Sequence, residues 1–196
     1  RQFELTIVGV LLHDTGYLKL RGDTVGTGAK YTFCHVLRSC AFAASYLPEL
    51  GASPAEIEAV IGAINCTGPT NEIGRLQFRA PVDRILGCAL ATADYLGQLA
   101  APNYPDKLDC LYAEFAESDD FVNLPAEKRV FKSARHLAEQ TPLFWDRMVR
   151  PRLEHDFDGV YRYLAAPYPH GRNAYFEAAE KNIGIIRSRL ATTTAA

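Results

Sequence analysis

Residues 3–17 read FELTIVGVLLHDTGY, and this stretch decides how the rest of the chain is interpreted. The apolar-rich segment 3–12 predicts a largely buried helix. That helix runs directly into His13 and Asp14, and Gly16 follows almost at once. A buried carboxylate at such a helix end needs a partner that supplies charge or hydrogen-bond donors. The doublet therefore either lies at a solvent-facing helix end or takes part in a metal site.

Helical patterns continue along the whole chain, and no stretch alternates like a strand over more than a few residues. The sequence Ser53-Pro54-Ala55-Glu56 is a capping box with proline at the first helical position. A glycine-rich loop is expected over 14–31, with Thr32 as the cap of the next helix, and Pro151 should kink or split its helix. Further helices are expected over 32–50, 53–65, 81–100, 106–118, 125–140, 142–164 and 173–190.

These patterns predict a single all-α domain over residues 1–190, followed by a short tail, 191–196. The chain opens at Arg1 in the middle of a helical pattern, so we expect an N-terminal helix to precede residue 1. At 196 residues the chain is long enough to bury a substantial core.

The composition limits the class of function. A net charge of -2 argues against a basic nucleic-acid surface, and no apolar run is long enough to span a membrane. The five cysteines are odd in number and form no C-x-x-C pair, which favours buried, reduced thiols in a cytoplasmic protein. No nucleic-acid or membrane partner is expected, and a homo-oligomer is left open.

Asp94 is the second polar residue in an apolar setting, within LATADYLGQLA. A divalent ion could satisfy His13, Asp14 and Asp94 together, and this donor set suits zinc, iron, manganese, nickel or magnesium. The alternative is that Asp94 caps a turn or pairs with an arginine such as Arg84 or Arg75.

The arrangement of motifs resembles the HD-domain superfamily of metal-dependent phosphohydrolases over residues 3–115. The resemblance rests on an apolar helix ending in LLHDTGY, a glycine-rich loop, a helix carrying HVLRS, a capped helix, and a later helix with ATADYLGQ. It implies a helical bundle of the HD type in which His13, Asp14 and Asp94 are metal ligands. In members with two metals, the doublet aspartate bridges the ions.

The chain also departs from the family pattern. The family's first ligand is a histidine upstream of the doublet, which would precede residue 1. His35 fits one of the two further histidines of two-metal members, but Asn65 and Cys66 stand where the other would fall, which argues against a full second site. Many members have a lysine where this chain has Tyr17. In this chain, Lys19 or Lys30 would have to take the role of that lysine.

His35 and Arg38 share one helix face, because they are three residues apart. A proton-donating histidine beside an arginine that grips phosphate oxygens suits a phosphoester site. His35 and Asp14 are therefore predicted to be catalytic, and Arg38 and Lys30 to bind phosphate. We expect His35 to contact the substrate phosphate or the metal's water ligand; the alternative is that it binds a second ion. The other doublet, His155-Asp156, has charged neighbours and is interpreted as a solvated helix face.

Two functions are compatible with these observations. The first is a metal-dependent phosphohydrolase that acts on a small phosphoester, including the option of a nucleotide. The second is an HD-like helical module with little or no activity that binds a ligand or a partner protein.

Overall fold

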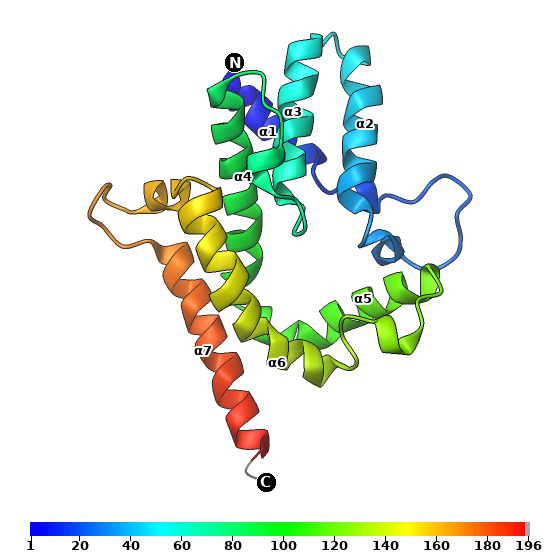
Figure 1. Cartoon of the computed structure of the whole chain (residues 1–196), viewed down its shortest axis with the longest axis vertical. Helices are drawn as coiled ribbons and strands as arrows, with labels where there is room; N and C mark the ends of the chain where they lie inside the picture. The colour runs from blue at the N-terminus through cyan, green and yellow to red at the C-terminus, as the bar shows by residue number, and fades with distance from the viewer. Residues whose placement is uncertain (195–196) are drawn as a thin grey trace.

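The structure is a computed structural model that describes residues 1–194, with side chains described through residue 192. Its fold is all-helical, as the sequence predicts, and the described residues contain no strand beyond an isolated bridge between Ala166 and Arg172. The main helices are α1 (Gln2–Leu12), α2 (His35–Glu49), α3 (Pro54–Thr67), α4 (Pro81–Leu99), α5 (Leu108–Phe121), α6 (Ala134–Phe144) and α7 (Ala174–Thr194) (Figure 1).

Two clusters of buried side chains hold these helices together. The N-terminal core lies between α1, α2 and α3, and its buried members are Leu5, Leu12, Cys40, Ala43, Leu47, Ala59, Val60 and Ile64. The larger C-terminal core gathers residues from α4, α6, α7 and the segment 145–157, including Leu96, Leu99, Leu137, Trp145, Phe157 and Ile183. Burial of such side chains is the main favourable contribution to folding.

Helix α4 takes part in both cores. Its Leu86 packs against the N-terminal core, whereas Ala91, Tyr95 and Leu96 belong to the C-terminal core. In Figure 1 this long helix runs from the group formed with α1 and α3 down to the region where α6 and α7 lie side by side. It is the structural link between the two halves of the chain.

The predicted helix starts at Ser53 and Pro81 are confirmed. The Ser53 hydroxyl accepts a hydrogen bond from the Glu56 amide, and the Glu56 carboxylate accepts one from the Ser53 amide, which completes the capping box. Pro81 is the first residue of α4, and Asp83 accepts a hydrogen bond from the amide of Ala80. These caps satisfy amide groups that a helix start leaves unpaired.

Other helix boundaries differ from the prediction. Thr32 does not cap α2, because its hydroxyl donates to the carbonyl of Ala29 and the helix begins only at His35. The helix expected from Pro125 begins at Ala134, where Ser133 accepts from the amide of His136. In each case the competing local hydrogen bond determines the start.

The C-terminal part also differs in detail. Pro142, expected to open a new helix, lies inside α6. Pro151 has no amide hydrogen, and π-helical turns, Trp145–Val149 and Arg152–Asp156, flank it in place of a clean break. Helix α7 continues through the first four residues of the expected tail, and residues 195–196 lie outside the described residues.

No helix within residues 1–194 combines the length and the apolar character that a membrane crossing requires.

Candidate metal centre

The doublet is positioned by the close approach of α1 to α4. A side chain at Gly9 would come within 3.3 Å of Leu90 on α4, so the absence of a Cβ lets the two helices pack tightly. His13 lies one turn beyond Gly9, and Asp94 lies one turn beyond Leu90. The packing of two apolar helix faces therefore brings these two polar side chains together.

The three predicted ligands converge as expected. The Nε2 atom of His13 lies 3.3 Å from Oδ2 of Asp14 and 3.7 Å from Oδ1 of Asp94. Two ligands of one ion, each held at about 2.0–2.2 Å, are separated by roughly 3 to 4 Å. The observed separations fall in this range, while the role of the three residues as ligands stays a prediction.

His35 joins this group from the other side of Asp14. It is the first residue of α2, and its Nε2 atom lies 3.8 Å from Oδ1 of Asp14. Its ring stacks on Tyr17, with the ring centres 4.5 Å apart and an angle of 15° between the planes. The two carboxylate oxygens of Asp14 thus face two different imidazoles.

Both imidazoles are oriented by backbone carbonyl groups. Nδ1 of His13 lies 2.7 Å from the carbonyl oxygen of Val10, and Nδ1 of His35 lies 2.7 Å from that of Thr32. A carbonyl oxygen only accepts hydrogen bonds, so each Nδ1 must carry the proton. In the neutral ring, Nε2 is then left with a lone pair directed at the carboxylates, which is the arrangement that metal-binding histidines use.

The turn that carries Tyr17 fits closely against the start of α2. A Cβ at Gly16 would lie 1.9 Å from the carbonyl oxygen of His35, so only glycine fits there. The amide of Gly16 also donates to the hydroxyl of Ser39, at 2.8 Å. These contacts fix the position of His35 relative to Asp14.

The charges of the site act on each other. The nearby carboxylate of Asp94, 3.7 Å away, and the negative charge of Asp14 raise the pKa of His13 to about 9, against the opposing effect of burial. Partial loss of contact with water raises the pKa of the Asp14 carboxyl. In the metal-free protein, a proton on His13 therefore supplies the positive charge that the carboxylates require.

The site is open to solvent on one side. The side chain of Asp14 is 55% exposed and that of Asp94 is 36% exposed, whereas each of the two imidazoles is 18% exposed. A small ligand can therefore reach the carboxylates, while the surrounding protein holds the histidine rings.

Of the two residues predicted to bind phosphate, Lys30 holds local structure. Its side chain is 4% exposed, and its ammonium group donates to Asp23 and to the carbonyl of Val25, each at 2.7 Å. Burial without this partner would be costly, so Lys30 fixes the loop before α2. The ammonium group is thus already engaged within the loop, and a role of Lys30 in phosphate binding stays a prediction.

Arg38 is also engaged in holding local structure. Its guanidinium donates to the carbonyls of Gly16 and Leu18, at 2.6 and 2.8 Å, and lies over the ring of Tyr31. These contacts tie the turn after the doublet to α2 and leave few donors for a phosphate. Lys19, considered as a substitute for the family's lysine, donates to the carbonyl of Gly26.

The residues at the expected position of a second-metal histidine do not act as ligands here. Asn65 donates its amide to the carbonyl of Ile61, and Cys66 is fully buried in the C-terminal core. Burial raises the pKa of the Cys66 thiol to about 12, which keeps it protonated and weakly ligating. The second doublet lies elsewhere, with His155 exposed, as expected of a solvated face.

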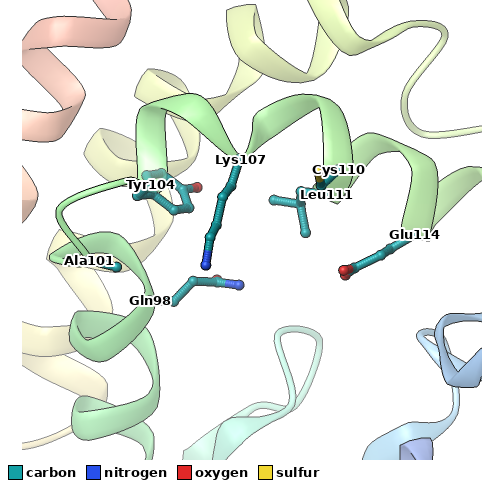
Figure 2. Close-up of a pocket in the computed structure, with 7 residues that line it drawn as sticks. All are labelled: Gln98, Ala101, Tyr104, Lys107, Cys110, Leu111 and Glu114. Carbon is teal, nitrogen blue, oxygen red and sulfur yellow. The ribbon is translucent and has the colours of Figure 1, made fainter.

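A small pocket adjoins the candidate centre and was not predicted. It has a volume of about 260 Å³ and lies between the end of α4 and the start of α5 (Figure 2). Gln98 lines it and stands one helical turn beyond Asp94. Lys107 immediately precedes α5 and Glu114 lies on it, and only the fold brings them to this place.

Within residues 1–194, no three histidine, cysteine, aspartate or glutamate side chains are gathered tightly enough to form a ready-made metal cluster. His13, Asp14 and Asp94 form a looser group, and the exposed carboxylates would have to rotate inward to close on an ion. A comparison with family models, curated proteins and solved structures finds no match to this chain.

Proposed function

We propose that this chain is a metal-dependent phosphohydrolase with an HD-type helical bundle, acting on a small phosphoester. The observation that carries the proposal is the pair of imidazoles around Asp14, each with Nδ1 fixed on a carbonyl and Nε2 facing the carboxylate. Two histidines that share one tautomer and one carboxylate suit the binding of an ion and a phosphate at neighbouring positions. The sequence resemblance to HD-domain phosphohydrolases supports the same reading.

His13, Asp14 and Asp94 would hold a divalent ion of the zinc, iron, manganese, nickel or magnesium group. When bound, such an ion would lower the pKa of a water molecule and polarise a phosphoryl oxygen. The protein supplies the orientation of the ligands, since Val10 fixes the ring of His13 and the packing of α1 on α4 fixes its distance from Asp94.

Asp14 and His35 would carry out the proton transfers. Asp14 is the more exposed of the two carboxylates and would orient the attacking water. His35 stands at the first position of α2, where unpaired backbone amides and the helix dipole favour an anion. With a second proton on Nε2 besides the one that Nδ1 shares with the carbonyl of Thr32, the ring would contact the phosphoryl group. It would give the Nε2 proton to the leaving oxygen as the bond to phosphorus breaks, while Asp14 takes a proton from the attacking water.

The second candidate function is a ligand-binding or partner-binding helical module with little activity. The absence of a tight three-residue cluster within residues 1–194, and Asn65 at the expected position of a further ligand, favour it. In such a module, the two histidines would bind a ligand but would not catalyse its hydrolysis.

One experiment separates the two candidates. The full chain is loaded separately with zinc, iron, manganese, nickel and magnesium, its metal content is measured by elemental analysis, and hydrolysis of p-nitrophenyl phosphate and bis-p-nitrophenyl phosphate is followed. We expect about one equivalent of metal and measurable turnover, both lost in Asp94→Ala. His155→Ala serves as the matched control, because it alters the exposed second doublet only. Absence of turnover with every metal would support the binding module.

Compartment and partners follow from the same observations. All five cysteines are free, and three of them are buried, so we propose a reducing, cytoplasmic environment. The proposed partner is a small phosphorylated molecule, and the oligomeric state stays open.

A further inference from the structure

The pocket beside the candidate centre presents polar groups at two opposite sides. Figure 2 shows the side chains of Lys107 and Gln98 close together on one side and the carboxylate of Glu114 on the other, with Leu111 between them. Lys107 and Glu114 are seven residues apart, which corresponds to about 10 Å along a helix. The pocket is therefore elongated, with donors at one end and an acceptor at the other.

None of these three polar side chains has a hydrogen bond or ion pair with another part of the chain through residue 192. Lys107 and Glu114 do not pair with each other either, although both line the same cavity. Partial burial and the nearby charge of Glu117 both raise the pKa of Glu114. All three side chains are exposed, so water satisfies them in the free protein and a ligand in the pocket would replace that water.

The pocket and the candidate centre are neighbours. Gln98 stands one turn beyond Asp94 on α4. Glu114 is close enough to Tyr17 for its charge to act on the phenol, together with those of Asp14 and Asp94. Tyr17 in turn stacks on His35, a residue of the candidate centre.

We propose that this pocket binds the organic part of the substrate, and that this part is a polyol the size of a sugar. The substrate class is then a phosphorylated sugar or sugar alcohol, with its phosphate at His35 and its hydroxyl groups between Lys107 and Glu114. This inference rests on the proposed function and narrows its substrate.

The chemistry of the lining favours hydroxyl groups over the alternatives. A hydroxyl accepts hydrogen bonds from Lys107 and Gln98 and donates them to Glu114, so one kind of group satisfies both ends. A nucleobase needs an exposed aromatic face, and the aromatic residue of the lining, Tyr104, is 6% exposed. The ammonium and carboxylate of an α-amino acid are attached to one carbon atom, whereas the donors and the acceptor of this lining stand on opposite sides of the pocket.

Cys110 also lines the pocket and gives a direct test of occupancy. Cys34 and Cys110 are the exposed cysteines of the chain, so a Cys34→Ser background leaves Cys110 as the reactive one. The rate of its alkylation by N-ethylmaleimide is measured with glucose 6-phosphate, O-phosphoserine, adenosine monophosphate or inorganic phosphate present. We expect glucose 6-phosphate to slow alkylation several-fold and the other three compounds to leave it unchanged.

Two variants test the proposed contacts. Glu114→Gln and Lys107→Met should each remove the protection of Cys110. They should also lower kcat/KM for glucose 6-phosphate about tenfold or more through KM, the scale for one hydrogen bond to a charged group. Metal content should not change. Asp109→Asn is the matched control, because it removes a carboxylate from α5 outside this pocket.

The outcomes separate this inference from the proposed function. Hydrolysis of p-nitrophenyl phosphate without any protection of Cys110 by glucose 6-phosphate would overturn the assignment of the pocket to the substrate. It would still support the proposed phosphohydrolase activity. Protection by glucose 6-phosphate in a protein that hydrolyses nothing would support the pocket and overturn the enzyme. Stronger protection by O-phosphoserine or adenosine monophosphate would overturn the polyol assignment.

Discussion

At the scale of single residues, the tautomers of two histidines carry most of the information about function. His13 and His35 come from different helices, yet the Nδ1–H group of each donates a hydrogen bond to the carbonyl oxygen three residues earlier. This local hydrogen bond fixes the ring and leaves Nε2 to face Asp14. The carboxylate of Asp14 thus lies between the two rings. We propose that His13 binds the ion and that His35 contacts the phosphate.

The separate roles of the two rings can be tested by His35→Ala. Because His13, Asp14 and Asp94 would hold the ion, we expect this variant to keep its metal content and to lose turnover by about 10²-fold or more, the usual scale for an acid–base group. Elemental analysis and steady-state kinetics measure the two effects. Loss of metal together with activity would instead make His35 a ligand of a second ion bridged by Asp14.

The raised pKa of His13 gives the metal-free protein a specific dependence on pH. The folded-state pKa is about 9, against 6.5 for the unfolded chain. The stabilisation is therefore fully present below about pH 6.5 and is lost as pH rises through about 9. We expect a loss of roughly 2 kcal/mol between pH 6 and 9 in urea unfolding, allowing for the partial exposure of the site.

The comparison for this prediction is His13→Gln, whose stability should change much less over the same range. The measurement stops at pH 9, because burial raises the pKa values of the thiols of Cys40, Cys66 and Cys88, and these groups add their own dependence above it. An equal loss of stability in the variant would show that other groups titrate.

At the scale of elements, the contact between the turn Thr15–Tyr17 and the start of α2 determines whether the site forms. The turn follows directly after Asp14, and Gly16 lies against the carbonyl of His35. The guanidinium of Arg38 holds the same turn through two carbonyl groups. A small displacement here would separate Asp14 from His35 without disturbing either core.

Gly16→Ala tests this contact. The added methyl group cannot fit at 1.9 Å from a backbone oxygen, so the turn must move. We expect a loss of roughly 1–3 kcal/mol of stability, as for other overpacked sites, and a larger proportional loss of turnover. Gly184→Ala is the control, since nothing lies within 4 Å of its added carbon, and it should stabilise α7 by up to about 1 kcal/mol. Unchanged turnover in Gly16→Ala would contradict the positioning role of the turn.

At the scale of the whole molecule, Arg152 ties the two halves together. Its buried guanidinium donates to the carbonyls of Pro69 and Asn71 in the connection after α3, and to the hydroxyl of Tyr95 on α4. It comes from the π-helical turn after Pro151, a segment that belongs to the C-terminal core. One side chain thus holds the end of the N-terminal half against the C-terminal half.

Arg152→Met should destabilise the protein by roughly 3 kcal/mol, because several buried carbonyl groups lose their donors at once. Chemical unfolding measures the change. Arg150→Met is the matched control, since Arg150 is an exposed residue that lies 3.9 Å from Glu180, and such pairs contribute little. A similar small effect in both variants would mean that the halves are held by apolar packing alone.

The sequence predicts the helical class and most helix starts, because apolar periodicity and capping residues act locally. The meeting of His13 with Asp94 is expected for another reason, namely that both are polar residues in apolar helices and that the motifs resemble those of HD-domain proteins. The sequence does not predict that Lys30 pairs with Asp23, nor that Lys107 and Glu114 share a pocket with Gln98. These features depend on how α5 lies against the loop before α2 and against the end of α4. No pattern along the chain records the distance between such segments.

The sharing of α4 between the two cores has a consequence for the smallest unit that can keep the site. His13, Asp14, His35 and Asp94 all lie in the first half of the chain, so a fragment ending near Leu99 contains every one of them. Such a fragment would nevertheless expose the face of α4 that Leu137, Trp145 and Ile183 help to bury. The four residues lie in one half of the chain, but their geometry depends on the other half. Truncation after α4 would therefore keep all four side chains and remove the packing that positions them.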